Sequence, residues 1–160
     1  MFNKTTVIAL AIAIGAVFAA ASFASDNSAS HHAQPLTAFA VVTALTQVDV
    51  DGDGKLSVGD ELVLQANDYD KAGGTQIGTG TVTCVAIDAT AGNFDCQGSD
   101  ALPGGEIRES GRIVGSDPTH FHWAITGGTG KYRGAGGQLD GTFVDANLTQ
   151  ATLTFSLLDR

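Results

Sequence analysis

Residues 76–97, QIGTGTVTCVAIDATAGNFDCQ, predict two β-strands joined by a turn. Residues 76–87 are rich in Thr, Val and Ile, residues 93–97 form a second short run, and residues 89–92 between them end in Gly. Cys84 and Cys96 lie symmetrically about Thr90, inside the predicted turn, so a hairpin centred there places them opposite each other. Opposed residues of an antiparallel pair have a Cα separation that a disulfide tolerates. We therefore predict a disulfide between Cys84 and Cys96, with two free buried cysteines as the alternative.

The pattern of this hairpin repeats along the chain. From Thr37 onward, short apolar or alternating runs are separated by Gly, Asp and Asn, and no long stretch keeps a helical period, which is typical of an antiparallel β protein. The expected strands are residues 38–48, 61–69, 76–87, 93–97, 105–114, 121–126, 137–144 and 150–158. Eight strands suit a closed barrel, and 21 Gly provide the bends that it requires. We predict an all-β fold, a single eight-stranded antiparallel β-barrel, with a two-sheet sandwich as the alternative.

The N-terminal residues have the order of a secretory signal peptide. Residues 1–6 include Lys4, residues 7–21 are apolar or small, and residues 22–24, SFA, offer the small residues that a signal peptidase reads. The apolar run is shorter than the roughly 20 residues of a membrane-spanning helix. We expect a signal peptide over residues 1–24, a flexible leader over 25–36 and the barrel domain over 37–160, with an uncleaved anchor as the alternative. The mature protein is then secreted, to the extracellular space or the periplasm, and has no membrane span.

The net charge restricts the class of partner. It is −9 for the whole chain, and loss of residues 1–24 removes one Lys and no acid. Nucleic acid and anionic lipid reward basic patches, so we expect neither as a partner. Cations and neutral small molecules remain, although acidity also serves solubility alone.

Residues 49–60, DVDGDGKLSVGD, fill the positions of a calcium-binding loop. Carboxylates stand at positions one, three, five and twelve, and Gly54 at position six permits the sharp turn. The predicted ligands are Asp49, Asp51, Asp53, Lys55 through its carbonyl, Ser57 through a water, and Asp60. The final position departs from the pattern, because Asp60 replaces the usual bidentate Glu, so we expect weak binding. We predict a structural calcium ion here, with an ion-free acidic turn as the alternative, and no organic cofactor.

A Gly-rich segment carries a family resemblance. Residues 124–135, AITGGTGKYRGA, lack phosphate-loop spacing, because Ile125 and Tyr132 stand where that loop needs Gly and Ser or Thr. They resemble the GGTGxF/YxGA signature of the allene oxide cyclase and dirigent superfamily. Residues 57–63, Tyr69 and residues 77–84 are similar to its Gly-Asp entry to the second strand and its Gly-rich third strand, so the resemblance covers about residues 38–158. The calcium-type loop and the cysteine pair are similar to bacterial secreted members.

The resemblance implies an eight-stranded barrel among cofactor-free cyclases and proteins that steer the coupling of small molecules. The polar residues of the plant cyclases find no residue-by-residue match, so no catalytic residue is assigned. Asn67, Tyr69 and Arg133 lie near strand ends and are the candidate ligand-binding residues. His120 and His122 project to one face of a strand, and we expect surface or lumen histidines there rather than a metal site.

The favoured function is a secreted barrel that binds a small apolar or aromatic molecule in a pocket at one end and guides its cyclisation or coupling. The alternative is a non-catalytic, calcium-stabilised binding or structural module of the cell envelope or extracellular space. A barrel filled by side chains would favour that alternative. The sequence leaves the oligomeric state open. A hydrolase is disfavoured because no G-x-S-x-G elbow and no recognisable Ser, His and Asp spacing occurs.

Overall fold

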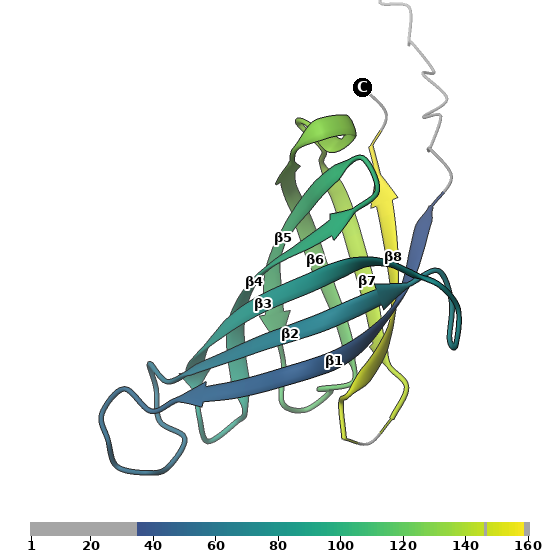
Figure 1. The fold of residues 1–160 in the computed structure, drawn as a ribbon. Helices are drawn as coiled ribbons and strands as arrows, with labels where there is room; N and C mark the ends of the chain where they lie inside the picture. The colour runs from purple at the N-terminus through teal and green to yellow at the C-terminus, as the bar shows by residue number, and fades with distance from the viewer. Residues whose placement is uncertain (1–34, 146, 159–160) are drawn as a thin grey trace, which may run out of the picture.

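The computed structural model describes residues 35–145 and 147–158, which form a closed antiparallel β-barrel (Figure 1). Each strand pairs with the next along the chain, and β8 pairs with β1 to close the barrel. The predicted eight-stranded barrel is confirmed, and the two-sheet sandwich is excluded. The predicted signal peptide and all but the end of the predicted leader lie outside the described residues. The elements are β1 (Leu36–Val48), β2 (Glu61–Tyr69), β3 (Gln76–Asp88), β4 (Asn93–Leu102), β5 (Gly105–Ile113), β6 (His120–Gly128), the short 3-10 helix η1 (Gly130–Tyr132), β7 (Gly137–Phe143) and β8 (Gln150–Leu157).

Strand β4 differs most from its prediction. The sequence pattern ends it at Gln97, whereas β4 continues to Leu102. Gly98 and Asp100 interrupt the β-forming pattern, but β3 and β5 both continue beside this segment and pair with it. Two neighbouring strands supply the backbone hydrogen bonds that the local sequence does not favour.

The predicted disulfide is confirmed. Cys84 on β3 lies directly opposite Cys96 on β4, their Cα atoms are 4.0 Å apart, and the sulfur atoms are bonded at 2.06 Å. Both residues are buried, and they belong to the apolar interior of the barrel. The bridge therefore joins two adjacent strands on the inner face.

Large aromatic side chains fill part of the interior because glycines face them. Trp123 packs on Phe121 with ring centroids 4.8 Å apart, and its indole Nε1 donates a hydrogen bond of 3.1 Å to the Arg112 carbonyl. A Cβ atom on Gly111 would collide with the Trp123 ring, and one on Gly141 would collide with Phe121. These glycines give the rings room against the barrel wall.

The two ends of the barrel differ (Figure 1). The loop end carries the β1–β2 loop, residues 49–60, and the β3–β4, β5–β6 and β7–β8 connections. The helix end carries η1, and there the start of β1 lies beside the last part of β8, since Leu36 pairs with Phe155. The buried side chains of Ile107, Tyr132 and Phe155 pack in the core at the helix end. Open space inside the barrel therefore lies toward the loop end.

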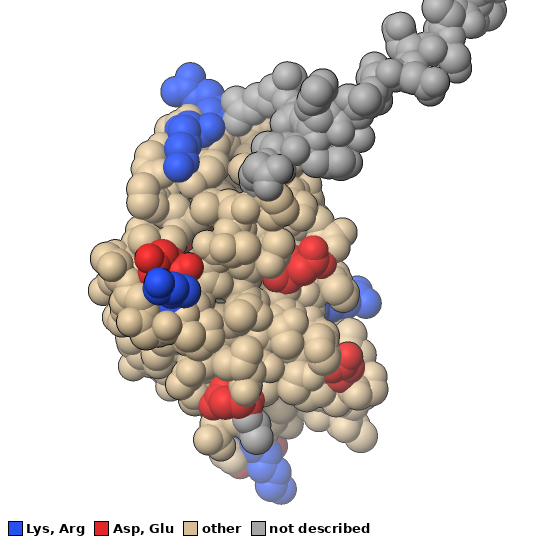
Figure 2. All heavy atoms as spheres, turned by 90° about the vertical axis from the view of Figure 1, so that its right-hand side faces the viewer, with Lys and Arg blue, Asp and Glu red and all other residues tan. Residues whose placement is uncertain are grey.

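The outer surface is thinly charged on the face that Figure 2 shows, where acidic and basic side chains form small scattered groups among other residues. The excess of acid is therefore not gathered into one patch on that face. Within residues 35–145 and 147–158, no helix has the length and apolar character needed to cross a membrane.

Candidate functional site

A cavity of about 220 Å³ lies inside the barrel. Leu45, which is 63% exposed, and Asn147 in the β7–β8 loop belong both to its lining and to the outer surface, so the cavity opens at the loop end. Its wall is mainly aliphatic and aromatic. The apolar lining residues are Ala40, Val42, Leu45, Leu62, Leu64, Ala66, Val82, Cys84, Ile113, Phe121, Trp123, Leu139, Phe143, Leu148, Ala151 and Leu153.

Three carboxyl side chains also line this cavity: Asp68 on β2, Asp100 on β4 and Glu109 on β5. All three are at most 5% exposed. Both carboxyl oxygens of Asp68 and Oε2 of Glu109 have no hydrogen-bond partner among the described residues. No Lys, Arg or His side chain is among the described residues that line the cavity. We refer to these three residues as the lumen carboxyls.

Two glycines make room for the lumen carboxyls. Gly80 on β3 pairs with Asp100, and Gly98 on β4 pairs with Glu109. A Cβ atom on Gly80 would lie 2.9 Å from Oδ1 of Asp100 and 3.6 Å from Oδ1 of Asp68, and one on Gly98 would collide with Oε1 of Glu109. The side chains of Asp68 and Asp100 therefore meet over Gly80, and Glu109 lies over Gly98.

Burial makes the lumen carboxyls weaker acids than exposed Asp and Glu side chains. Desolvation raises the pKa of Asp68 to about 6 and that of Glu109 to about 7. Desolvation also raises the pKa of Asp100 well above its ordinary value, and the charges of Glu109 and Asp68 raise it further. Asp100 lies within hydrogen-bonding reach of the other two carboxyls, so a proton on Asp100 can be shared with either. Near neutral pH the three lumen carboxyls together hold both a proton and a negative charge. They are therefore suited to donate or to accept a proton.

The residues proposed from the sequence as ligand-binding lie elsewhere. Asn67 and Tyr69 alternate along β2 with the inward-facing Ala66 and Asp68, and Oδ1 of Asn67 accepts a hydrogen bond of 3.1 Å from the Gln76 side chain. Arg133 is exposed just after η1. None of these three candidates is among the residues that line the cavity, and the structure does not bring them together.

The lumen carboxyls were not among the sequence candidates, although the sequence contains a signal for them. Asp68 keeps the alternation of Leu62, Leu64 and Ala66, and Glu109 keeps that of Ile107. An acidic residue at an inward, apolar position of a strand is unusual, because burial of a charge is costly.

The acidic β1–β2 loop gathers three of its six predicted ligands. Ligand oxygens of Asp49, Asp51 and Asp53 lie within 4.8 Å of one another. Backbone N–H groups of Gly54 and Gly52 donate to the Asp49 carboxylate, each at 2.7 Å, and lower its pKa. Such a cluster of carboxylate oxygens is the donor set that calcium prefers.

The other three predicted ligands have structural contacts in this loop. The Asp60 carboxylate is fully buried and accepts hydrogen bonds from the backbone N–H groups of Val50, at 2.9 Å, and Ser57, at 2.8 Å. The Ser57 hydroxyl donates to Asp51 at 2.9 Å, and the backbone N–H of Lys55 donates to Asp53 at 2.7 Å. Asp60 therefore closes the base of the loop and is not part of the carboxylate cluster.

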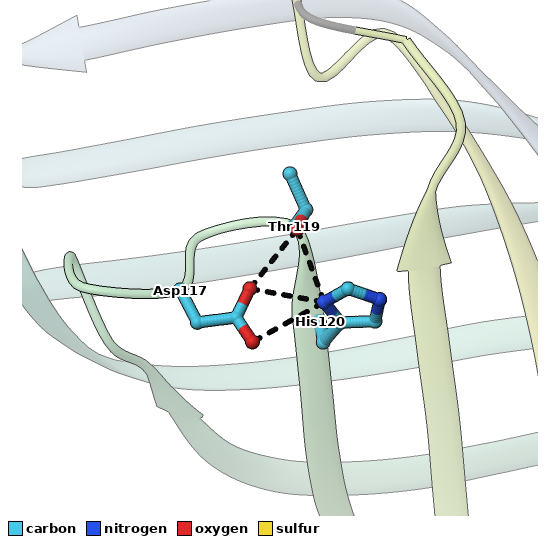
Figure 3. Close-up of polar contacts among 3 residues, drawn as sticks. All are labelled: Asp117, Thr119 and His120. Atoms are coloured by element: carbon cyan, nitrogen blue, oxygen red, sulfur yellow. Dashed lines mark hydrogen bonds and ion pairs between the residues drawn. The ribbon is translucent and has the colours of Figure 1, made fainter.

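The two histidines of β6 lie on the outer surface, each beside a carboxylate. Nδ1 of His120 lies 2.9 Å from Oδ1 of Asp117 and 3.1 Å from the Thr119 hydroxyl (Figure 3). Nδ1 of His122 lies 2.5 Å from Oδ1 of Asp140 on β7. Both imidazoles are more than half exposed, so they take no part in the cavity.

Solved proteins share the fold of this barrel. Pyocyanin demethylase matches it with a TM-score of 0.64 at 23% sequence identity, over 78% of this chain and 99% of that chain. A pterocarpan synthase dirigent protein matches with a TM-score of 0.61 at 18% identity, over 79% of this chain and 94% of that chain. The barrel has the allene oxide cyclase and dirigent-like fold.

A cyclase described as nonspecifically heme-binding, which catalyses a 4 + 2 cycloaddition during neoabyssomicin biosynthesis, has the same fold. Its TM-score is 0.62 at 18% identity, over 82% of this chain and 66% of that chain. No protein-family model and no curated protein matches the sequence.

Proposed function

We propose that the barrel binds a small, largely apolar molecule in its cavity and guides the cyclisation or coupling of that molecule. The observation that carries this proposal is the position of the lumen carboxyls in the wall of a largely apolar cavity. The fold is shared with a dirigent protein and a cycloaddition-catalysing cyclase, which is consistent with this class of reaction.

Two physical effects would act on a bound molecule. The apolar wall limits the conformations that the ligand can adopt. Because it holds the reacting atoms close together, it lowers the entropic part of the activation free energy that the same reaction has in solution. A carboxyl group with a pKa near neutrality can protonate a developing negative charge, or remove a proton, at little cost. Asp100 is the group we assign to proton donation, because desolvation and two neighbouring carboxyls keep its pKa well above the ordinary value.

The cavity restricts the size of the ligand. Pockets for drug-sized ligands enclose roughly 300–1,000 Å³, whereas this one encloses about 220 Å³. A ligand of one or two fused rings, or a longer one that extends through the opening near Leu45, is consistent with that volume. We further propose that the protein acts outside the cytoplasm.

A second candidate function rests on the acidic loop. The cluster of Asp49, Asp51 and Asp53 would hold a calcium ion, and calcium would then stabilise a binding or structural module with no chemistry of its own. We propose calcium as a structural ion under either function, because the loop lies at the end of the barrel and its carboxylates do not line the cavity.

A ligand screen with matched variants distinguishes the two functions. The chain from residue 25 is tested by fluorescence displacement against phenolics, polyketides and hydroxylated fatty acids. Ala66→Leu adds bulk to the cavity wall, whereas Ala124→Leu makes the same change at an exposed position of β6. We expect the first variant to lose ligand binding and the second to retain it. Absence of any ligand, in this panel and among neutral and cationic aromatic compounds alike, would refute the binding function.

Product analysis then tests catalysis. Once a ligand has been identified, the rate and stereochemistry of its cyclisation or coupling are compared between the wild type and Asp100→Asn. We expect the variant to lose rate while it retains affinity. A ligand that binds but reacts identically with and without the protein would leave only the non-catalytic module.

A further inference from the structure

We propose that the ligand of this cavity carries a positively charged nitrogen on a planar aromatic ring system, and that the lumen carboxyls recognise that charge. This inference rests on the proposed function of the cavity and names its substrate class. It follows from the charge, the unpaired oxygens and the aromatic wall of one site.

The first observation is an uncompensated charge. Apart from the proton that Asp100 can share, no donor among the described residues reaches the two carboxyl oxygens of Asp68 or Oε2 of Glu109, and no basic side chain is part of the described lining. Burying a carboxylate without a partner is costly, and a buried charge is normally paired. The two arginines of β5, Arg108 and Arg112, are exposed and pair with Glu106 and Asp95 instead. A positively charged ligand can therefore supply the counter-charge that the described lining of the cavity lacks.

The second observation is the aromatic wall. Phe121, Trp123 and Phe143 all line the cavity, and the Phe121 ring lies 4.8 Å from Trp123 and 5.6 Å from Phe143 between centroids. Aromatic rings stack on planar ligands, and their faces attract cations, most strongly when water is excluded. A delocalised cation on a flat ring therefore satisfies the carboxyls and the aromatic wall together.

A metal ion fits the lumen carboxyls less well. Within residues 35–145 and 147–158, the only group of three acidic or metal-ligating side chains whose ligand atoms lie within 4.8 Å of one another is Asp49, Asp51 and Asp53. The lumen carboxyls instead lie on β2, β4 and β5, so they form a row across the barrel wall with Asp100 in the middle. A row of acceptors beside apolar rings matches an organic cation better than a compact divalent ion, which needs oxygens around it.

An anionic ligand is disfavoured by the same groups. A carboxylate, such as that of a fatty acid, would lie beside a buried negative charge if its head group entered the cavity, and like charges close together cost several kcal/mol. The acidic loop at the open end, and the net charge of −9, would also favour the approach of cations over anions.

Three probes of equal ring size test the inference. N-methylquinolinium is cationic, 1-methylnaphthalene is its neutral isostere, and 1-naphthoate is the anionic counterpart. Binding to the wild type is measured by titration calorimetry at fixed pH and calcium. Quenching of Trp123 reports binding inside the barrel, because Trp123 is the single Trp of the chain and lines the cavity. We expect the cation to bind at least about tenfold more tightly than the neutral probe, and the anion to bind most weakly.

Variants locate the source of this preference. Asp68→Asn combined with Glu109→Gln should abolish the preference for the cation while the neutral probe binds as before. Asp95→Asn, an exposed carboxylate on the same strand as Asp100, should leave the preference unchanged. The wild-type comparison does not depend on any variant, so poor folding of the double variant would not remove the test.

Two results would overturn the inference, and they differ in what they leave standing. If the neutral probe binds as tightly as the cation and quenches Trp123, the ligand class is wrong while the cavity remains a binding site. If none of the three probes binds, both the ligand class and the binding of small aromatic molecules by this cavity are refuted.

Discussion

Replacing Asp68 by Asn tests whether the lumen carboxyls are as strongly buried as the structure indicates. Burial raises the pKa of Asp68 from 3.8 to about 6, so between these values the folded protein binds more protons than the unfolded chain. The stabilisation from this proton is fully present below about pH 4 and is lost as the pH rises through about 6. The difference between the two pKa values corresponds to about 3 kcal/mol. An amide side chain cannot ionise, so the Asp68→Asn protein should lack this loss.

The assay is urea unfolding between about pH 4 and pH 8, in chelator so that the acidic loop binds no metal. We expect the wild type to lose stability relative to Asp68→Asn by up to about 3 kcal/mol across this range. Asp95→Asn is the control, since its side chain is 59% exposed. The carboxyls with lowered pKa, Asp49, Asp117, Asp140 and Asp145, titrate below this range. A wild-type stability that runs parallel to that of Asp68→Asn would refute the burial of this charge.

Three further predictions concern the glycine, the loop and the disulfide. Gly98→Ala should lower the free energy of unfolding by about 1–2 kcal/mol and also lower the affinity for the cationic probe, because the added Cβ atom meets the Glu109 carboxyl. Gly127→Ala is the matched control, because a Cβ atom there meets nothing within 4 Å. Equal effects of the two substitutions would contradict the prediction. Calcium at ten times its Kd should add about 1.4 kcal/mol to the unfolding free energy, measured as a rise in Tm against chelator, and Asp49→Ala with Asp51→Ala should abolish that rise. Removing the bridge by Cys84→Ala with Cys96→Ala should lower the unfolding free energy by about 3 kcal/mol, so an unchanged urea midpoint would show that the bridge contributes little.

The strands could be predicted from the sequence because their signals are local. Turn residues separate runs of β-forming residues, and the spacing of Cys84 and Cys96 about Thr90 fixes the register of one hairpin, which the structure reproduces. The closure of β8 on β1 was inferred from the strand number and from the Gly-rich signature at residues 127–135. Barrel closure is a non-local contact between β1 and β8, so the signature indicates it only through the family resemblance and not through local propensity.

The candidate site was harder to predict because it depends on contacts between distant strands. The sequence pattern does not place Asp100 in a strand, because the Gly and Asp residues after Gln97 indicate the end of β4. The environment of Asp100 is created by Gly80, which lies opposite it on β3. Asn67 and Tyr69 were proposed because they are polar and lie near a strand end, but their neighbour Asp68 faces the cavity. A shift of one residue along a strand exchanges the inner and outer faces.

The pairing of Leu36 with Phe155 determines how the barrel can be attached to other structures. The first strand begins and the last strand finishes at the helix end, whereas the cavity opens at the loop end. A tether joined ahead of Leu36 or beyond Leu157 would therefore anchor the barrel with its opening directed away from the support. For an engineered sensor, the barrel could be immobilised through either terminus, and circular permutation with a short linker between the two strand ends would leave the binding opening free.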